Sequence, residues 1–393
     1  MTDILKDNHQ IIQILEKIYN GLDDERNSNF GLLGGEAGKL LFKYHYLDFI
    51  GELEQSENFL VDLEYLLENL QNSVLTGFCN GSSGVLWLLS YLLKSGVLDD
   101  EVYDLISHNF NIYKRECLAF IGSGNYDFLH GGLGIAFFIL YAENQIDHTF
   151  FSVVFQGLNS LIDEELGMIP HFDFDDFELD NGKVNLGLAH GITSVLKFSI
   201  ECYNKNVCQV QSLDLSQKII RYLMLNVNSD TSFSFFPNVI VKGSESQVSG
   251  RPSWCYGDLG IGIILYQAGD SFKDQKLQKF SLNILRKHCL QTSYEASILD
   301  AGLCHGSAGL FHIYNRIWKL TNETVFEQAS LFWLEKTIGY TKFSGDSCFY
   351  DRYLPSDGYE KSYAILDGTA GVGLAYLSYL TGKHHWDYSL MLN

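Results

Sequence analysis

A glycine motif that recurs seven times is the feature that most constrains how this chain can fold. Each copy is a Gly-x-x-Gly-like turn that leads into an apolar run, and only the fourth copy has a serine, Ser194, in place of the second glycine. The first glycines of the motifs are Gly35, Gly81, Gly131, Gly191, Gly257, Gly306 and Gly368. Successive motifs lie 46 to 66 residues apart, which fits two helices and their connecting loops per repeat.

Two kinds of helix are predicted to alternate along the chain. The segment after each motif is apolar on nearly every side, as in residues 135–140, which is typical of a helix that is buried all round. The segments between motifs are one-sided: Leu63, Leu66 and Leu70 recur at helical spacing, and Asp62 lies outside that stripe. Each repeat is therefore predicted to contain an outer amphipathic helix, a loop, a glycine turn and an inner buried helix.

The two ends of the array decide between an open and a closed arrangement. An open solenoid needs polar terminal repeats, but the first and last glycine motifs are as apolar as the middle ones. We therefore predict an all-α fold, an α/α toroid (barrel) of seven inner and seven outer helices. Glycines, which lack a Cβ, let the starts of the inner helices crowd together at the centre. All seven motifs would then open on one face, where a binding site is expected.

We expect residues 1–393 to form a single domain, because the repeats are continuous, prolines number only four and no Pro/Ser-rich linker divides the chain. Two stretches depart from the helical rhythm. The first, near residues 169–184, is acidic and aromatic, and the second, near residues 228–250, is β-prone and then rich in glycine and serine. These insertions are either plain surface loops or segments that shape the binding face.

The net charge and the first residues of the chain limit the kinds of partner and the cellular location that we expect. A net charge of −21 disfavours nucleic-acid binding, which needs a basic surface. It suits a cationic partner, or serves solubility alone. The polar start has no signal-peptide core, and the apolar run 131–142 is shorter than the about 20 residues that cross a bilayer. We expect a soluble cytoplasmic protein with no transmembrane segment. Its eight cysteines do not indicate a disulfide framework.

Two neighbouring motifs carry metal-ligand chemistry. Cys255 and Cys304 each stand two residues before their motif glycine, and His305 follows Cys304. Consecutive repeats of a ring are neighbours in space, so two thiolates and an imidazole could meet there. That set suits Zn²⁺ in a tetrahedral site with its fourth position open. The plainer alternative is two buried cysteines and a capping histidine, and the matched register argues against it.

An open zinc position supports two reactions. It can hold a substrate thiol as a thiolate, or a water molecule as hydroxide for hydrolysis. Two thiolate ligands leave more electron density on the metal than three histidines would. This weakens the Lewis acidity of the ion and favours thiol chemistry.

Other polar residues stand at motif positions that face the same centre. His190 precedes Gly191 and is a candidate general acid or base, or else a satisfied capping residue. His130 precedes its own motif glycine in the same register and is an equal rival by position. Asp127 and Arg251 are either functional or part of structural ion pairs and solvated charge. Tyr256 adjoins Cys255 and either donates a hydrogen bond behind it or packs.

These motifs resemble the lanthionine synthetase C-like family over essentially the whole chain. The resemblance rests on the sevenfold glycine pattern, on Gly-Leu-Ala-His190-Gly, on Arg251-x-x-Trp-Cys255-Tyr256-Gly and on Cys304-His305-Gly. It implies an α/α toroid with one catalytic zinc ion that acts on precursor peptides already dehydrated at serine and threonine. A peptide cysteine thiol then adds to dehydroalanine or dehydrobutyrine and closes a lanthionine or methyllanthionine ring, as in lantibiotic biosynthesis.

The resemblance also implies residue roles. The zinc ligands would be Cys255, Cys304 and His305. His190 matches the histidine proposed to protonate the enolate at Cα. Further active-site positions are matched by Asp127, Arg251 and Tyr256. His130 stands where the family has no fixed catalytic residue, so we place it below His190.

The resemblance implies partners as well, and it leaves alternatives. With no extra domain recognisable, the chain is expected to be a stand-alone cytoplasmic cyclase that takes a dehydrated precursor peptide. A dehydratase and a peptide exporter are expected in a biosynthetic complex, with which the chain could associate at the membrane surface. One alternative is the transfer of glutathione to dehydroamino acids, as in a eukaryotic branch of the family. Others are a zinc hydrolase and a non-catalytic, zinc-stabilised peptide-binding toroid.

A carbohydrate-processing toroid is the remaining alternative. Such a glycosidase needs two carboxylates aimed at one site. The acidic residues near the motifs form no clear pair in the sequence; they are Glu36, Asp127, Asp258 and Asp367.

Overall fold

The computed structural model describes residues 2–22, 26, 29–70, 75–229, 232–244, 250–289, 297–343 and 350–393. The chain divides into two compact units, and each is described by itself. The first unit consists of residues 1–73 and 286–393, and the second consists of residues 74–285. No helix in the described part of the chain is long and apolar enough to cross a membrane.

Every motif glycine stands directly before an inner helix, as the repeat predicted. The seven inner helices of the described residues are α2 (Glu36–Ile50), α4 (Ser82–Lys94), α6 (Gly132–Ala142), α8 (Ile192–Asn204), α10 (Asp258–Ser271), α12 (Ser307–Thr321) and α14 (Thr369–Thr381). The glycines are sterically required. A Cβ on Gly368 would lie 2.4 Å from the carbonyl oxygen of Ser362. Gly257 has a φ of +83°, a value that L-residues rarely adopt.

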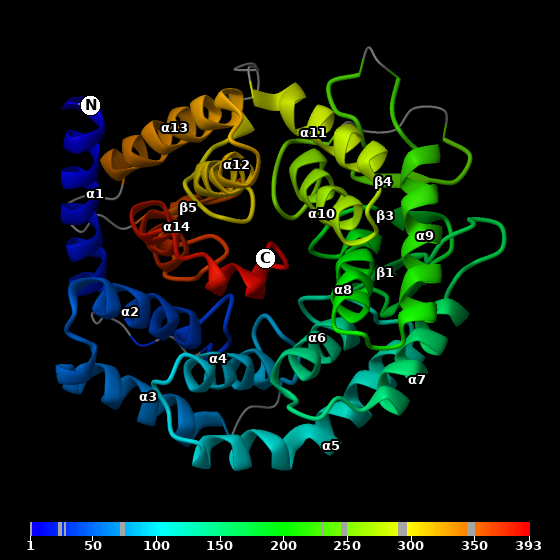
Figure 1. The fold of residues 1–393 in the computed structure, drawn as a ribbon, viewed down its shortest axis with the longest axis horizontal. Helices are drawn as coiled ribbons and strands as arrows, with labels where there is room; N and C mark the ends of the chain where they lie inside the picture. Colours follow the sequence, from blue (N-terminus) through cyan, green and yellow to red (C-terminus); the bar gives the residue numbers. More distant parts are fainter. Residues whose placement is uncertain are drawn as a thin grey trace. The chain divides into compact units, whose positions relative to one another are not determined.

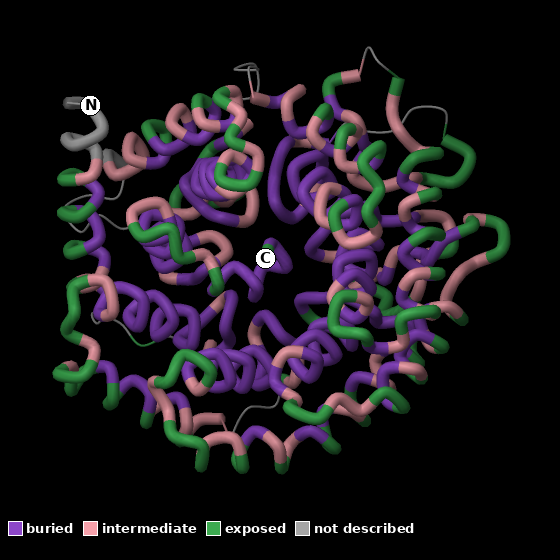
Figure 2. Tube along the Cα trace, viewed as in Figure 1, coloured by how far each residue is buried: buried purple, intermediate pink, exposed green. Residues whose placement is uncertain are grey.

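The remaining helices form the amphipathic set. Among the described residues they are α1 (Thr2–Gly21), α3 (Glu57–Leu70), α5 (Glu101–Gly122), α7 (His148–Ser160), α9 (Gln209–Leu225), α11 (Gln275–Cys289) and α13 (Thr324–Gly339). Burial separates the two sets, as Figure 2 shows: the inner helices are buried along most of their length, and the amphipathic helices alternate buried and exposed residues. On α3, Leu63 and Leu66 are buried, whereas Leu60 is 57% exposed.

Both units are two-layered. In unit 2, the inner helices α4, α6, α8 and α10 contact one another in sequence, and α5, α7 and α9 lie outside them (Figure 1). In unit 1, α12, α14 and α2 are successive neighbours, while α13 packs on α12, α1 on α14 and α3 on α2. The boundary between the units falls within α11. Short 3-10 helices occur at η1 (Leu53–Gln55), η3 (Tyr340–Phe343) and η5 (His385–Leu390).

The insertions form small antiparallel sheets of two strands each. The stretch near 169–184 contains β1 (His171–Asp173), β2 (Glu178–Asp180) and the start of β3 (Lys183–Asn185). The stretch near 228–250 contributes β4 (Val239–Val241), and Val184 on β3 lies opposite Ile240 on β4. Residues 230–231 and 245–249 of that stretch lie outside the described residues. A further hairpin, β5 (Arg352–Leu354) with β6 (Gly358–Glu360), was not predicted from the sequence.

One expectation about α3 is wrong. Asp62, which the helical pattern placed outside the apolar stripe, is buried. The reason lies on other elements: its carboxylate is 2.5 Å from Lys43 Nζ on α2 and 2.7 Å from Arg26 Nη2. A buried carboxylate is retained where such partners compensate the loss of hydration.

Candidate functional site

In the described residues, four pairs of consecutive motif loops are joined by the same backbone hydrogen bond. In each case the residue two positions before a motif glycine donates its N–H to the carbonyl oxygen of the equivalent residue in the next repeat. The bonds run from Cys79 to Leu129 (2.8 Å), from Ala189 to Cys255 (3.2 Å), from Cys304 to Leu366 (2.7 Å) and from Leu366 to Leu33 (3.2 Å). Each of these bonds lies within one unit. Residues at the same position relative to the motif glycine are thus in direct contact between these repeats.

In unit 2 this register brings Asp127 and His190 together. The Nδ1 atom of His190 lies 2.7 Å from Oδ2 of Asp127, whose side chain is only 1% exposed. The other oxygen, Oδ1, accepts a hydrogen bond of 2.7 Å from the backbone N–H of His130. A buried carboxylate with both oxygens engaged fixes the nitrogen it faces, so Nε2 of His190 is the nitrogen left for chemistry.

The surroundings of His190 set its acidity. Burial alone would lower the pKa of His190, but its hydrogen bond with Asp127 and the negative charges of Asp127 and Cys255 outweigh burial and raise that pKa. The protonated form therefore persists to higher pH than in a free histidine. A partly exposed imidazolium held by a buried carboxylate is suited to donate a proton.

The loop of the fifth motif completes this cluster. The carbonyl oxygen of Cys255 accepts hydrogen bonds from the backbone N–H groups of Leu188 (2.9 Å) and Ala189 (3.2 Å), the two residues before His190. The ring of Tyr256 lies 6.1 Å from the imidazole of His190, between ring centroids. Arg251 lies four residues before Cys255 and is half-buried. The Cys255 side chain is buried within the same loop.

In unit 1 the sixth motif holds Cys304 and His305, and both residues are half-buried. A buried carboxylate lies behind the histidine: Oδ2 of Asp300 is 3.8 Å from Nε2 of His305. The same carboxylate accepts backbone N–H bonds from Gly302 (3.1 Å) and Tyr353 (3.0 Å). At 3.8 Å the two atoms are beyond hydrogen-bond distance, so Asp300 is a charged neighbour of His305. Asp300 and Tyr353 were missed from the sequence, because Asp300 precedes the motif by six residues and Tyr353 lies on β5.

The predicted site residues are therefore placed in two groups. Unit 2 brings together Asp127, His190, Cys255 and Tyr256, and Arg251 lies in the same loop as the last two. Unit 1 holds Cys304 and His305. The three-ligand zinc site draws on both units and stays a prediction.

A second histidine cluster occurs in unit 1, and no sequence motif predicted it. His312, His384 and Asp387 each offer a ligand atom within 4.8 Å of the others. Nε2 of His312 is 2.9 Å from Oδ2 of Asp387, and Nε of Arg316 is 3.4 Å from the same oxygen. Because Arg316 already balances Asp387, a divalent cation would add uncompensated charge to a buried place. The cluster therefore fits a structural ion pair that anchors η5 to α12.

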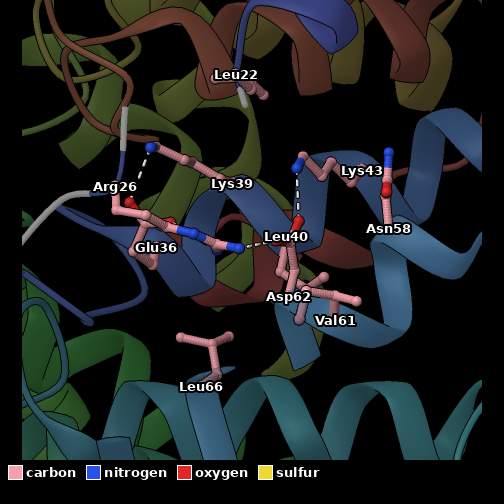
Figure 3. A pocket seen from close by; sticks show the side chains of 10 residues that line it. All are labelled: Leu22, Arg26, Glu36, Lys39, Leu40, Lys43, Asn58, Val61, Asp62 and Leu66. Atoms are coloured by element: carbon pink, nitrogen blue, oxygen red, sulfur yellow. Dashed lines mark hydrogen bonds and ion pairs between the residues drawn. The ribbon is translucent and has the colours of Figure 1, made fainter. Parts of the chain in front are cut away.

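A charged cavity of about 270 Å³ lies elsewhere in unit 1 (Figure 3). Its cations and carboxylates alternate: Lys39 is 2.8 Å from Glu36, and Arg26 is 3.7 Å from Glu36 and 2.7 Å from Asp62. Lys43 completes the chain of ion pairs at Asp62. The arrangement ties α2 to α3 and to the segment before the first motif, so it is explained by stability.

The remaining motif carboxylates are also structural. Asp258 accepts N–H bonds from Phe235 (2.7 Å) and Phe236 (2.9 Å). Asp367 is 3.0 Å from Nη1 of Arg352. Carboxylates engaged in this way leave no pair free for glycoside hydrolysis, which disfavours that alternative.

Comparisons with known proteins agree with this architecture. The family model described as lanthionine synthetase C-like protein matches residues 29–391. The nisin biosynthesis protein NisC of Lactococcus lactis subsp. lactis is 23% identical over 363 residues, covering 84% of this chain and 81% of that protein. A solved structure of nisin cyclase superposes with a TM-score of 0.71 at 19% identity, covering all of this chain and 98% of that one.

A further match is local. Isoleucine–tRNA ligase of Symbiobacterium thermophilum is 28% identical over 71 residues, which is 18% of this chain and 8% of the ligase. It covers too little of either protein to bear on the fold. The full-length matches, together with the mostly helical structure, confirm the predicted all-α fold of the α/α-toroid class. The chain belongs to the lanthionine synthetase C-like family.

Proposed function

We propose that this protein is a zinc-dependent lanthipeptide cyclase, which adds cysteine thiols to dehydroalanine or dehydrobutyrine within one peptide. The observation that carries the proposal is the Asp127–His190 pair beside the Cys255 loop. It provides a proton donor next to a candidate thiol-activating site. Family membership and the names of the full-length matches support the same reaction class.

The proposed ligands Cys255, Cys304 and His305 fit a zinc ion by their chemistry. Cys255 and Cys304 occupy the motif position whose backbone groups bond from one repeat to the next elsewhere in the chain. We propose that the same rule holds between the fifth and sixth motifs, which would make the two thiols neighbours. The Asp300 carboxylate, 3.8 Å from Nε2 of His305, would orient the histidine if the two side chains close to hydrogen-bond distance when the metal binds. When bound, zinc would supply the Lewis acidity that keeps a substrate thiol deprotonated near neutral pH.

The remaining steps are the addition of the substrate sulfur to Cβ and the protonation of Cα, in which we propose that residues of this protein take part. The substrate sulfur attacks Cβ, a C–S bond forms, and the electrons of the C=C bond move onto the carbonyl as an enolate. His190 delivers the proton on Nε2 to Cα while Asp127 holds Nδ1. Arg251 would stabilise the enolate oxygen by its positive charge. Tyr256 would form the wall of the site next to His190. The proton lost by the thiol equals the proton gained at Cα, so the product has the mass of the substrate.

Metal analysis and thiol titration test this function together. We expect about one zinc ion per chain, lost in Cys304→Ala and kept in Cys208→Ala, a cysteine outside the proposed site. With a dehydrated peptide that contains cysteine, the native protein should consume the free thiol without a change in mass. His190→Asn should keep zinc and lose turnover, whereas His108→Asn, an exposed histidine on α5, should change neither. A native protein without zinc, or zinc-independent thiol loss, would refute the proposal.

Three broader predictions accompany the reaction. We propose that residues 1–393 act as one domain, a view supported by a family match that runs through both units. The net charge of −21 would suit a peptide substrate with cationic segments. A dehydratase and a peptide exporter remain the proposed partners of this cytoplasmic chain, in a complex at the membrane surface, and co-purification from cells that express all three proteins would test them.

A further inference from the structure

We propose that His130 and Phe174 are positioning residues that hold the imidazole of His190 at the angle it needs to deliver a proton. This inference rests on the proposed function for its catalytic consequence. It concerns the two neighbours of His190 that the family resemblance leaves without a role. Neither is proposed to exchange protons itself.

His190 is enclosed by aromatic rings. The ring of His130 is stacked on it at a centroid distance of 6.0 Å and an interplanar angle of 25°. Phe174 approaches both imidazoles edge-on, at 6.0 Å and 75° from His190 and at 5.8 Å and 90° from His130. The ring of Tyr256 lies 6.1 Å from the His190 ring, tilted by 34°. Aromatic pairs favour these offset and edge-to-face geometries.

The hydrogen bond to Asp127 does not fix the ring by itself. It constrains Nδ1, but the imidazole can still pivot by small rotations about its Cα–Cβ and Cβ–Cγ bonds. A pivot swings Nε2 through an arc, and proton delivery to one carbon requires a narrow range of positions. Contacts on the ring face and edge by His130 and Phe174 remove that freedom.

The same carboxylate couples His130 to His190. Asp127 accepts the backbone N–H of His130 on Oδ1 and holds His190 on Oδ2. The third and fourth motif loops therefore share one buried anchor, and the stacked rings project from it as a pair. This explains why His130 stands in the same register as His190 without being its equivalent.

Phe174 comes from an insertion whose role the sequence left open. It follows β1 directly and is supported by the buried ring of Phe172 at 5.2 Å. Leu179 on β2 packs against Gly124: a Cβ on that glycine would lie 2.8 Å from Cγ of Leu179. The hairpin is thus seated on the end of α5 and places Phe174 over His190. The insertion near 169–184 serves the site and is more than a surface loop.

Paired variants distinguish the packing of the rings at positions 130 and 174 from the effect of their polar atoms. His130→Ala and Phe174→Ala remove a ring, whereas His130→Phe and Phe174→Tyr keep one. The substrate is a synthetic peptide with one dehydroalanine and one cysteine. If position matters, each alanine variant should lower kcat about tenfold with KM unchanged, and each ring-keeping variant should stay within about twofold of the native protein. His130 is exposed and Phe174 is half-buried, so all four variants should fold, as thermal unfolding will check.

The outcomes are decisive. Equal losses in His130→Phe and His130→Ala would show that His130 acts through its nitrogens and would overturn the inference. Full kcat in both alanine variants would also overturn it. If the native protein shows no zinc-dependent thiol loss, the proposed function fails, and proton–carbon NMR of the His190 ring decides the positioning question alone. The inference then requires the His190 signals to move or broaden in the alanine variants and to stay in place in the ring-keeping ones.

Discussion

The substitution Asp127→Asn tests the proton donor most directly, because it removes one charge and keeps the side-chain shape. The asparagine oxygen can still accept the N–H of His130, which leaves its NH₂ group facing Nδ1 of His190. That nitrogen must then accept a hydrogen bond where it now donates one. His190 would lose both the charge that stabilises its imidazolium and the tautomer that the carboxylate selects.

The size of the effect follows from the geometry. A hydrogen bond to a charged group contributes about 1.5–3 kcal/mol, and one pKa unit corresponds to about 1.4 kcal/mol. The pKa of His190 should therefore fall, because burial is then opposed only by the charge of Cys255. Above the native pKa, the protonated fraction falls in proportion, so we expect turnover to drop about ten- to a hundredfold.

Stability should respond with a defined sign. The pKa of His190 is raised in the folded protein, so the Asp127–His190 pair stabilises the fold below the ordinary histidine pKa. That stabilisation is lost as the pH rises through the raised pKa. Urea unfolding should therefore show Asp127→Asn to be more destabilising at pH 6 than at pH 9.

The measurements are an NMR titration of His190, turnover against pH, and urea unfolding. Asp147→Asn is the matched control: Asp147 caps α7 through Phe150 and pairs with Lys114, away from the site. It should cost at most about 1 kcal/mol of stability, because asparagine still caps the helix and only the charge that pairs with Lys114 is lost, and it should leave both the titration of His190 and turnover unchanged. If Asp127→Asn leaves the pKa of His190 where it is, the argument for this pair is wrong.

Three further predictions concern the scaffold. Gly257→Ala should cost at least about 1–3 kcal/mol in urea unfolding, because the residue has φ +83° and a Cβ would lie 2.0 Å from the Arg251 carbonyl oxygen; unchanged stability would contradict this. Burial lowers the pKa of His45 and of His384 to about 3 in the folded protein. As the pH falls, these histidines are therefore protonated in the unfolded chain before they are protonated in the folded protein. As the pH falls below about 6.5, unfolding free energy should drop by up to about 1.4 kcal/mol per pH unit per histidine, and His384→Asn should flatten the slope. Lys43→Met should cost at most about 3–5 kcal/mol, since Arg26 still pairs with Asp62, and the double variant with Asp62→Leu should recover part of the loss.

The sequence predicted what local rules determine. A motif glycine marks each inner helix start because a side chain at that turn meets a backbone carbonyl, as at Gly368, and this requirement is local. The burial of Asp62 could not be predicted from the helical pattern of α3, because its partners Lys43 and Arg26 lie outside that helix. The role of Phe174 was invisible for the same reason, since its contact with His190 depends on how the β1–β2 hairpin seats on α5.

More of the candidate site than of the hairpins could be predicted from the sequence. The reason is that residues at equivalent positions of successive repeats are in contact. The N–H of Ala189 bonds to the carbonyl of Cys255, and both residues stand two positions before their motif glycines. The equivalent bond recurs between Cys304 and Leu366 in the other unit. A function that needs groups from several repeats therefore gains by placing them at fixed offsets from the glycine, as Cys255, Cys304 and His190 are placed. Moving such a residue by one position should abolish its role even where the loop tolerates the change, because its side chain would no longer face the equivalent position of the next repeat.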